Sequence, residues 1–275
     1  MSDKDRDYVE KVEAWYRGRV GLEYFRLQRS LIWRLLEPRP GERLLDVGCG
    51  AGHHLLFFQR EGLFVAGLDP SPAMLEAARA RLGRGADLRG GRAEDLPFSD
   101  NEFDVVTLIY CLEAVSDPEA AVAEAFRVAR RRVFIGVNNP LSLDILSFRV
   151  REFWSGASKD QVRYYTLWEL LNLVRRIGGA ARIRWASVGQ LPRFLAGRAY
   201  SFESFPLIQR SPFGAFLGLA APVTGALRMD NLTIKVKPAL AGAKVPAPTP
   251  TTCGPWGRTA LVVAQPEGAS REVRP

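Results

Sequence analysis

The sequence predicts an α/β fold in which a doubly wound, mostly parallel sheet carries helices on both faces. Three observations predict it. Strand-like apolar runs alternate with helical patterns between residues 44 and 188. The first apolar run ends in an acid and a glycine-rich turn, as strands do where they lead tightly into a helix. Hydrophobic residues make up 47% of the 275 residues, enough for a substantial core.

Two helices are expected before the first strand. Residues 5–18 predict a short helix, and residues 21–37 predict a second one. In the second, Leu27, Leu31 and Leu35 recur at four-residue steps, which is typical of a buried helical stripe. The Pro-Arg-Pro-Gly sequence that follows ends this helix. We therefore interpret residues 1–40 as an N-terminal helical cap.

The alternating elements follow in order along the chain. The predicted strands are 44–48, 63–68, 86–90, 103–110, 132–137 and 181–188, and the predicted helices between them are 53–61, 72–82, 118–130 and 167–177. A capping residue followed by proline starts two of these helices, at Ser71 and Asp117. Thr166 and Glu169 form a capping-box pattern before the last helix.

The turn after the first strand is the most informative segment. It reads Asp-Val-Gly-Cys-Gly-Ala-Gly from Asp46, with glycines at Gly48, Gly50 and Gly52. Glycine has no Cβ, so backbone N–H groups can approach a ligand closely. His53 stands where a dinucleotide-binding pattern has its last glycine, and no Lys-Ser or Lys-Thr pair follows as in a P-loop. Asp46 would repel a pyrophosphate but suits a ligand that carries an amino group or a sulfonium.

A second acid ends the second predicted strand. Asp69 lies seventeen residues past Gly52. An acid in this place can accept both hydroxyls of a ribose, and the nearby glycine turn favours that role over an ordinary strand-end acid. Ligands of open parallel sheets bind beyond the carboxyl ends of the strands. Asp46, Asp69 and Tyr110 are therefore expected to share one edge of the sheet.

Four motifs occur in a fixed order. They are residues 44–52, Gly-Leu-Asp-Pro-Ser-Pro-Ala-Met-Leu-Glu-Ala-Ala-Arg at 67–79, Gly-Arg-Ala-Glu-Asp-Leu-Pro-Phe at 91–98 and Phe-Asp-Val-Val at 103–106. Together they resemble the class I S-adenosylmethionine (SAM) dependent methyltransferases, in the small-molecule branch of methyltransferase type 11 that includes quinone-biosynthesis enzymes. The resemblance covers about residues 40–185. It implies a Rossmann-like sheet of seven strands closed by an antiparallel hairpin, an EC 2.1.1 transferase activity, and SAM or S-adenosylhomocysteine (SAH) as cofactor.

The resemblance also implies the cofactor contacts. They are Tyr16, Asp46, Gly48, Cys49, Gly50, Gly52, Asp69, Pro70, Met74, Ala93, Glu94 and Tyr110. Tyr16 would cap the cofactor from the N-terminal segment, although an aromatic residue on a helix also fits a core position. Arg92 stands where the family has an aspartate that receives the adenine amino group. Adenine recognition then falls to the backbone of Ala93 and Glu94 or to the Glu94 carboxylate.

The sequence does not single out a catalytic residue. Methyl transfer from a sulfonium mainly requires alignment of the reactants, and orientation can contribute about 7–11 kcal/mol to lowering a barrier. If a general base is needed, the candidates are Tyr110, Glu113, Tyr165 and His53, with Tyr164 beside them. His53 and His54 are the only histidines, and adjacent helix positions point in different directions, so we expect no metal site.

Residues 190–257 interrupt the alternation. They hold several phenylalanines and prolines and then a Pro/Ala/Thr-rich run. We take residues 258–264, Arg-Thr-Ala-Leu-Val-Val-Ala, as the last strand, with 231–236 and 213–220 as alternatives. On this interpretation 41–189 is the SAM-binding domain, 190–257 is an insertion that caps the substrate, and 258–275 returns to the domain as its last strand and tail.

The expected function is methyl transfer from SAM to a small, partly apolar acceptor, because aromatic and apolar side chains line most ligand sites. One alternative is a SAM-binding regulatory protein without catalysis. The other is a peripheral-membrane lipid or quinone methyltransferase, with residues 205–221 on the lipid, although Pro206 and Pro212 interrupt any long amphipathic helix there.

Composition sets the remaining expectations. The net charge of +8 comes from scattered arginines, which favours solvated faces over a nucleic-acid site. Three cysteines without a framework spacing favour the reducing cytoplasm. The N-terminus lacks the apolar region of a signal peptide, and no run of eighteen apolar residues predicts a transmembrane segment.

Overall fold

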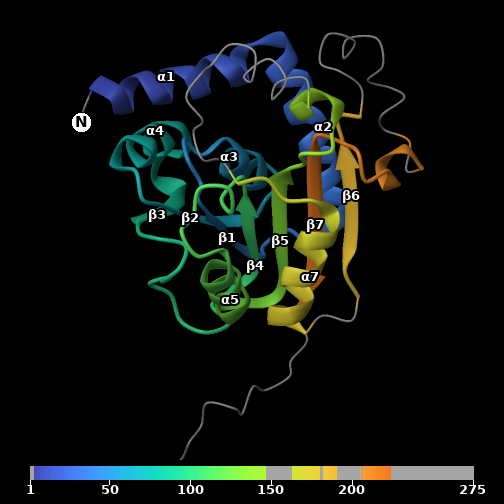
Figure 1. The fold of residues 1–275 in the computed structure, drawn as a ribbon. Helices are drawn as coiled ribbons and strands as arrows, with labels where there is room; N and C mark the ends of the chain where they lie inside the picture. The colour runs from blue at the N-terminus through green and yellow to red at the C-terminus, as the bar shows by residue number, and fades with distance from the viewer. Residues whose placement is uncertain (1–2, 147–162, 180–181, 191–204, 206, 224–275) are drawn as a thin grey trace, which may run out of the picture. The chain divides into compact units, whose positions relative to one another are not determined.

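The computed structural model describes residues 3–146, 163–179, 182–190, 205 and 207–223, all within a compact unit that spans Met1–Ala226. Within this part, seven strands form one sheet in the order β3-β2-β1-β4-β5-β7-β6 (Figure 1). The strands are β1 (Arg43–Val47), β2 (Phe64–Asp69), β3 (Ala86–Gly90), β4 (Phe103–Ile109), β5 (Ala129–Asn138), β6 (Arg184–Val188) and β7 (Phe216–Pro222). The predicted seven-stranded α/β sheet is confirmed.

Strand direction fixes where the functional edge lies. Strands β1 to β5 pair in parallel, whereas β7 pairs antiparallel with both β5 and β6. In the register of the sheet, Asp46 lies opposite Gly67 on one side and Thr107 on the other. The carboxyl ends of the five parallel strands therefore meet at one edge, which is where a ligand of such a sheet binds.

Helices cover both faces of the sheet (Figure 1). They are α1 (Asp3–Arg17), α2 (Arg19–Leu36), α3 (His53–Arg60), α4 (Pro72–Leu82), α5 (Pro118–Val128) and α7 (Leu167–Gly178), with short 3-10 turns at Gly83–Gly85 and Ile208–Arg210. Successive strand residues point to opposite faces. Leu45 and Val47 pack into a core with α5 and α7, whereas Leu44 packs into a second core with α2, α3 and α4.

Polar caps define three of the helix starts, as the sequence predicts. The Ser71 hydroxyl accepts a hydrogen bond from the Met74 N–H at 3.4 Å, and Asp117 accepts two backbone N–H groups of α5. Thr166 and Glu169 satisfy each other's backbone N–H groups in a complete capping box. These caps satisfy donors that the first helical turn leaves without an intrahelical partner.

We expect Thr166→Ala to lower the free energy of unfolding by about 1 kcal/mol, because the cap loses its side-chain acceptor. Thr166→Ser keeps a hydroxyl at the same position and should stay close to the wild type. Urea denaturation at pH 7 measures the difference. Equal stabilities for the alanine and serine variants would show that the capping box contributes nothing.

The closing strand differs from the first choice made from the sequence. Phe216–Pro222, which overlaps the alternative at 213–220, takes the antiparallel place between β5 and β6 that we expected 258–264 to fill. Strand β7 is buried on both faces and therefore lacks the alternation that marks a half-exposed strand. A Cβ on Gly218 would lie 2.5 Å from Leu31 of α2, which explains a glycine inside this strand. Residues 224–275, including 231–236 and 258–264, lie outside the described residues, and the division at 190–257 stays a prediction.

Candidate functional site

The glycine turn is tied to the end of the neighbouring strand. Backbone N–H groups of Gly48 and Cys49 both donate to the Leu68 carbonyl, at 2.7 and 3.0 Å. All three glycines have positive φ, at 74°, 51° and 78° in chain order. Gly48 and Gly52 are tightly packed, since a Cβ would lie 3.0 Å from Cys111 or 3.2 Å from Ala78. A Cβ on Gly50 would meet no described atom within 4 Å, so the turn is open to a ligand there.

Asp69 holds the open part of the turn. Its Oδ2 accepts the N–H of Gly50 at 2.8 Å, and its Oδ1 accepts the N–H of Ser71 at 2.9 Å. The side chain is buried, which raises the pKa of the carboxyl, while the two backbone hydrogen bonds oppose that rise. Each carboxylate oxygen keeps a lone pair that can accept a ribose hydroxyl. Pro70 next to it is exposed, and Met74 is buried in the first turn of α4.

Asp46 is the second acid at this edge. Only 2% of the residue is exposed, and the Thr107 hydroxyl donates to its Oδ1 at 2.7 Å. Burial raises the pKa of Asp46 to about 7, the Thr107 hydrogen bond opposes this, and the charge of Asp69 adds to it. A cation beside Asp46 would stabilise its ionised form. Thr107 was not predicted from the sequence, although a hydroxyl in the apolar strand Phe-Asp-Val-Val-Thr-Leu-Ile was a visible signal.

Glu94 joins the loops after β3 and β4. Its Oε1 accepts the N–H of Ser116 at 3.0 Å and the guanidinium of Arg92 at 3.0 Å. Partial burial opposes ionisation, but the backbone hydrogen bonds and Arg92 hold the pKa of Glu94 below its usual range. Ala93 beside it is buried. The Glu94 carboxylate is thus already engaged, and its predicted role toward adenine stays a prediction.

Tyr110 lies at the end of β4 in an uncommon backbone conformation. Its φ is 58°, and its N–H donates to the Gly136 carbonyl at 2.8 Å. A bulky residue in this region is strained, and such strain concentrates at functional sites. The Tyr110 hydroxyl accepts a hydrogen bond from Gln28 of α2, which is only 2% exposed. Gln28 was also missed, although a polar residue within the apolar stripe of that helix was the signal.

Side chains of helix α1 contact residues next to the glycine turn. The ring of Tyr16 stacks on His53, with centroids 3.7 Å apart and planes at 13°. Glu13 of the same helix lies 3.2 Å from His53 Nε2 and pairs with Arg81 of α4 at 2.5 Å. Arg81 also donates to the carbonyl of Ala51 in the turn. Helix α1 runs across α4 in Figure 1. Tyr16 contacts His53, the residue after the turn, and its role in covering a cofactor stays a prediction.

The four candidate bases are all engaged by other groups. Both carboxylate oxygens of Glu113 accept hydrogen bonds from Asn138 at the end of β5, and burial raises the pKa of this carboxyl. Tyr165 donates its hydroxyl to the Leu112 carbonyl at 3.2 Å. Burial lowers the pKa of His53 to about 4, so its imidazole is neutral at pH 7 and weakly basic. Tyr110 is bonded to Gln28, as described above. The arrangement fits a site that positions a ligand more than one built around a free base.

No group of three or more His, Cys, Asp or Glu side chains in the described part of the chain is arranged to hold a metal ion. None of the helices among these residues combines the length and apolar character that crossing a membrane requires.

Two acids and an open glycine turn lie together at the carboxyl edge of a doubly wound sheet, an arrangement typical of α/β proteins that bind nucleosides. Residues 45–135, about a third of the chain, match the family described as "Methyltransferase domain". The match places a methyltransferase-like domain in this part of the chain, in agreement with the resemblance seen in the motifs.

Individual known methyltransferases are similar to this chain in sequence or in fold. The chain is 37% identical over 103 residues to demethylmenaquinone methyltransferase of Tropheryma whipplei (strain Twist), covering 37% of this chain and 43% of the relative. The match therefore spans less than half the length of that relative. A SAM-dependent methyltransferase of Thermotoga maritima superposes with a TM-score of 0.59 at 21% identity, over 80% of this chain and 97% of the other. Magnesium protoporphyrin IX methyltransferase of Synechocystis PCC 6803, solved with SAH bound, gives 0.55 at 14% identity over 78% and 94%. Both structures establish the fold alone.

Proposed function

We propose that this chain is a SAM-dependent methyltransferase, of the EC 2.1.1 class, that acts on a small, partly apolar acceptor in a reducing compartment such as the cytoplasm. One observation carries the proposal. The Asp69 carboxylate holds the N–H of Gly50, at the one glycine of the turn where a Cβ would enter open space. The methyltransferase domain at residues 45–135 and the quinone-directed relative support the same activity.

The residues at this edge fit SAM group by group. Asp69 has free lone pairs for the two ribose hydroxyls, and the bare backbone of Gly50 lets the ligand lie against the turn. Asp46 supplies a carboxylate whose ionisation a cationic group would favour. SAM, when bound, supplies a methyl group already activated by its sulfonium. The protein then has to bind it, orient the acceptor in line and exclude water. Tyr16 of α1, which stacks on His53 next to the turn, would cover the ligand there.

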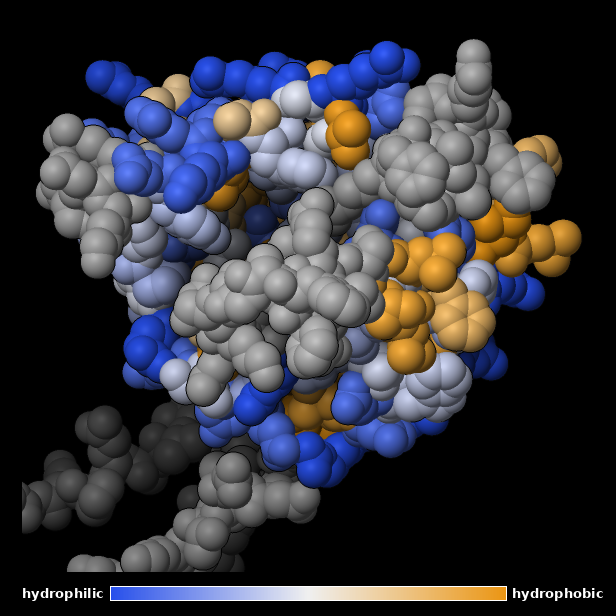
Figure 2. Space-filling model, turned by 45° about the horizontal axis from the view of Figure 1, so that its top comes forward, coloured by the Kyte–Doolittle hydropathy of each residue, from blue (hydrophilic) through white to orange (hydrophobic). Residues whose placement is uncertain are grey.

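Apolar side chains near the same edge support a partly apolar acceptor. Leu141, Leu143 and Leu146 follow β5, and Phe213 precedes β7; all four are at least 41% exposed. Asn138 of β5 pairs with Phe216 of β7, so the segment after β5 and the segment before β7 start at the same edge of the sheet. Figure 2 looks onto this end and shows hydrophobic residues gathered on one side of it. Such exposed groups mark surfaces that bind apolar ligands or partners.

Two measurements on the same variants test the proposal. Asp69→Asn should weaken SAM binding about ten- to hundredfold in calorimetry, because a hydrogen bond to a charged group contributes about 1.5–3 kcal/mol. The matched control is Asp87→Asn, an exposed acid of β3 that pairs with Arg89 and should leave SAM binding unchanged. Methyl-tritiated SAM should transfer label to a member of a panel of hydroquinones, phenols and carboxylates with wild type but not with Asp69→Asn. Equal SAM affinity in wild type and Asp69→Asn contradicts the proposed site. SAM binding without any transfer of label favours the regulatory alternative.

A further inference from the structure

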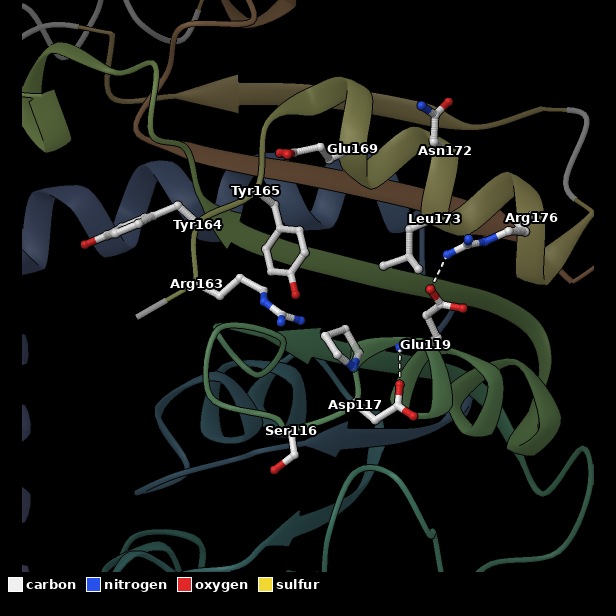
Figure 3. A pocket seen from close by; sticks show the side chains of 11 residues that line it. Ser116, Asp117, Glu119, Arg163, Tyr164, Tyr165, Glu169, Asn172, Leu173 and Arg176 are labelled. Carbon is white, nitrogen blue, oxygen red and sulfur yellow. Dashed lines mark hydrogen bonds and ion pairs between the residues drawn. The ribbon is translucent and has the colours of Figure 1, made fainter. Parts of the chain in front are cut away.

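A groove of about 740 Å³ lies between α5 and α7, apart from the glycine turn (Figure 3). Its walls include Ser116, Asp117, Arg163, Tyr165, Glu169 and Arg176. It adjoins the loop that follows β4, since Tyr165 donates to the Leu112 carbonyl and the Arg163 N–H donates to the Glu113 carbonyl at 3.5 Å. Tyr110 begins the same loop, so this loop separates the groove from the edge where SAM would bind.

The acidic residues of the groove are already committed to partners within the fold. Asp117 caps α5, and Glu169 completes the capping box of α7. Glu119 forms an ion pair with Arg176, so the Arg176 guanidinium is also engaged within the fold. All three carboxylates that line the groove therefore hold groups of the fold, and Glu119 is the one paired with a cation.

Arg163 differs from these residues. No ion pair found among the described residues includes it. Its guanidinium lies beside the hydroxyl of Tyr165 in Figure 3, and this neighbouring charge opposes the rise in the pKa of that phenol caused by burial. Tyr165 is only 7% exposed and is fixed at the other side by Leu112. Figure 3 shows the Arg163 side chain extending into the groove beside this hydroxyl. The Arg163 guanidinium thus lies beside the buried phenol of Tyr165 and has further N–H groups available to a ligand.

We propose that this groove binds an anionic group of the methyl acceptor, a carboxylate or a phosphate, with Arg163 as the binding residue and Tyr165 as the residue that positions it. The inference rests on the proposed function and names the acceptor class. The planar guanidinium presents paired donors that match both anions in a bidentate arrangement. The anion lies on one side of the loop after β4 and the reacting end of the acceptor reaches around it to the methyl donor.

Three probes of similar shape distinguish the contribution of the negative charge to binding from that of the aromatic ring. They are phenylacetate, phenylphosphate and the neutral phenylacetamide. Each is titrated at pH 7.5 into the full chain saturated with SAH, and binding is followed by protein NMR. We expect at least one anion to bind about tenfold more tightly than the amide, and Arg163→Gln to remove that preference. The tighter of the two anions identifies the acceptor group as carboxylate or phosphate. Arg163→Lys should restore part of the affinity, since it keeps the charge but not the fork.

The matched control is Arg175→Gln, which removes the same charge from α7 next to the groove but does not line it. This variant should keep the anion preference within about twofold, because exposed charges contribute little at a distance. Equal binding of anion and amide, or an Arg163→Gln variant that binds anions like wild type, overturns the inference while SAH binding stays intact. Failure of the wild type to bind SAH instead overturns the proposed function, and the inference with it.

Discussion

Gly50→Ala is expected to weaken SAM binding about five- to hundredfold while the protein still folds. The Cβ would enter the open space beside the Asp69 hydrogen bond, which is where the ligand would lie against the backbone. Forcing extra atoms into an occupied site costs about 1–3 kcal/mol, and a residue at φ 51° adds strain of about 1–2 kcal/mol. Calorimetric titration of SAM, together with thermal unfolding of the ligand-free variant, measures both effects.

The control variant Gly179→Ala separates the effect of backbone strain from the effect of blocking the ligand site. Gly179 ends α7 with φ 59°, and a Cβ there also meets no described atom within 4 Å. The two alanine variants should therefore lose similar stability, about 1 kcal/mol each. Only Gly50→Ala should lose SAM affinity. A Gly50→Ala protein that binds SAM as tightly as Gly179→Ala would place the ligand elsewhere.

Asp46→Asn should make the ligand-free protein more stable and a poorer binder of SAM. The folded protein raises the pKa of Asp46 to about 7, so the folded state holds a proton that the unfolded state has released above about pH 4. Stability from this group is therefore present at low pH and is lost as the pH rises through 7. Asparagine carries no charge to bury, and at pH 8 the variant should gain about 4 kcal/mol over wild type.

The difference in stability between wild type and Asp46→Asn isolates this effect. Burial lowers the pKa of both histidines, His53 to about 4 and His54 to about 3, so both proteins gain stability as the pH rises through the unfolded-state pKa of about 6.5. Urea denaturation from pH 4.5 to 8 should show wild type losing stability relative to Asp46→Asn up to about pH 7 and a nearly constant difference above that. Thr107→Val removes the hydrogen bond that favours ionisation and should move the wild-type loss to higher pH. A wild type and an Asp46→Asn variant with parallel profiles would exclude Asp46 as a buried, proton-holding acid.

Helix boundaries were the most predictable part of the fold because single residues set them. Ser71 with Pro72 predicted the start of α4, and the structure gives Pro72–Leu82 as the sequence did. Strand β7 was less predictable, because a strand buried on both faces carries neither alternation nor β-branched residues to mark it. Its place depends on β5 and β6, whose pairing with it no local pattern encodes.

The acids of the site followed from their place at strand ends, since parallel strands bring their carboxyl ends to one edge. The residues that support these acids could not be predicted in this way. Thr107 and Gln28 act through partners that are 61 and 82 residues away in sequence, and only the folded chain brings each pair together. The link from Glu13 to Arg81 spans 68 residues and depends on how α1 crosses α4. Polar residues inside apolar stripes signal such partners, but they do not identify them.

The most direct test of the account is calorimetric titration of SAM into the wild-type chain at pH 8, with NAD titrated in parallel. A turn open at Gly50 and flanked by Asp46 and Asp69 predicts one-to-one saturation by SAM below about 1 mM and no saturable binding of NAD. Absence of SAM binding at millimolar concentration, or tighter binding of the pyrophosphate-containing NAD, would contradict it.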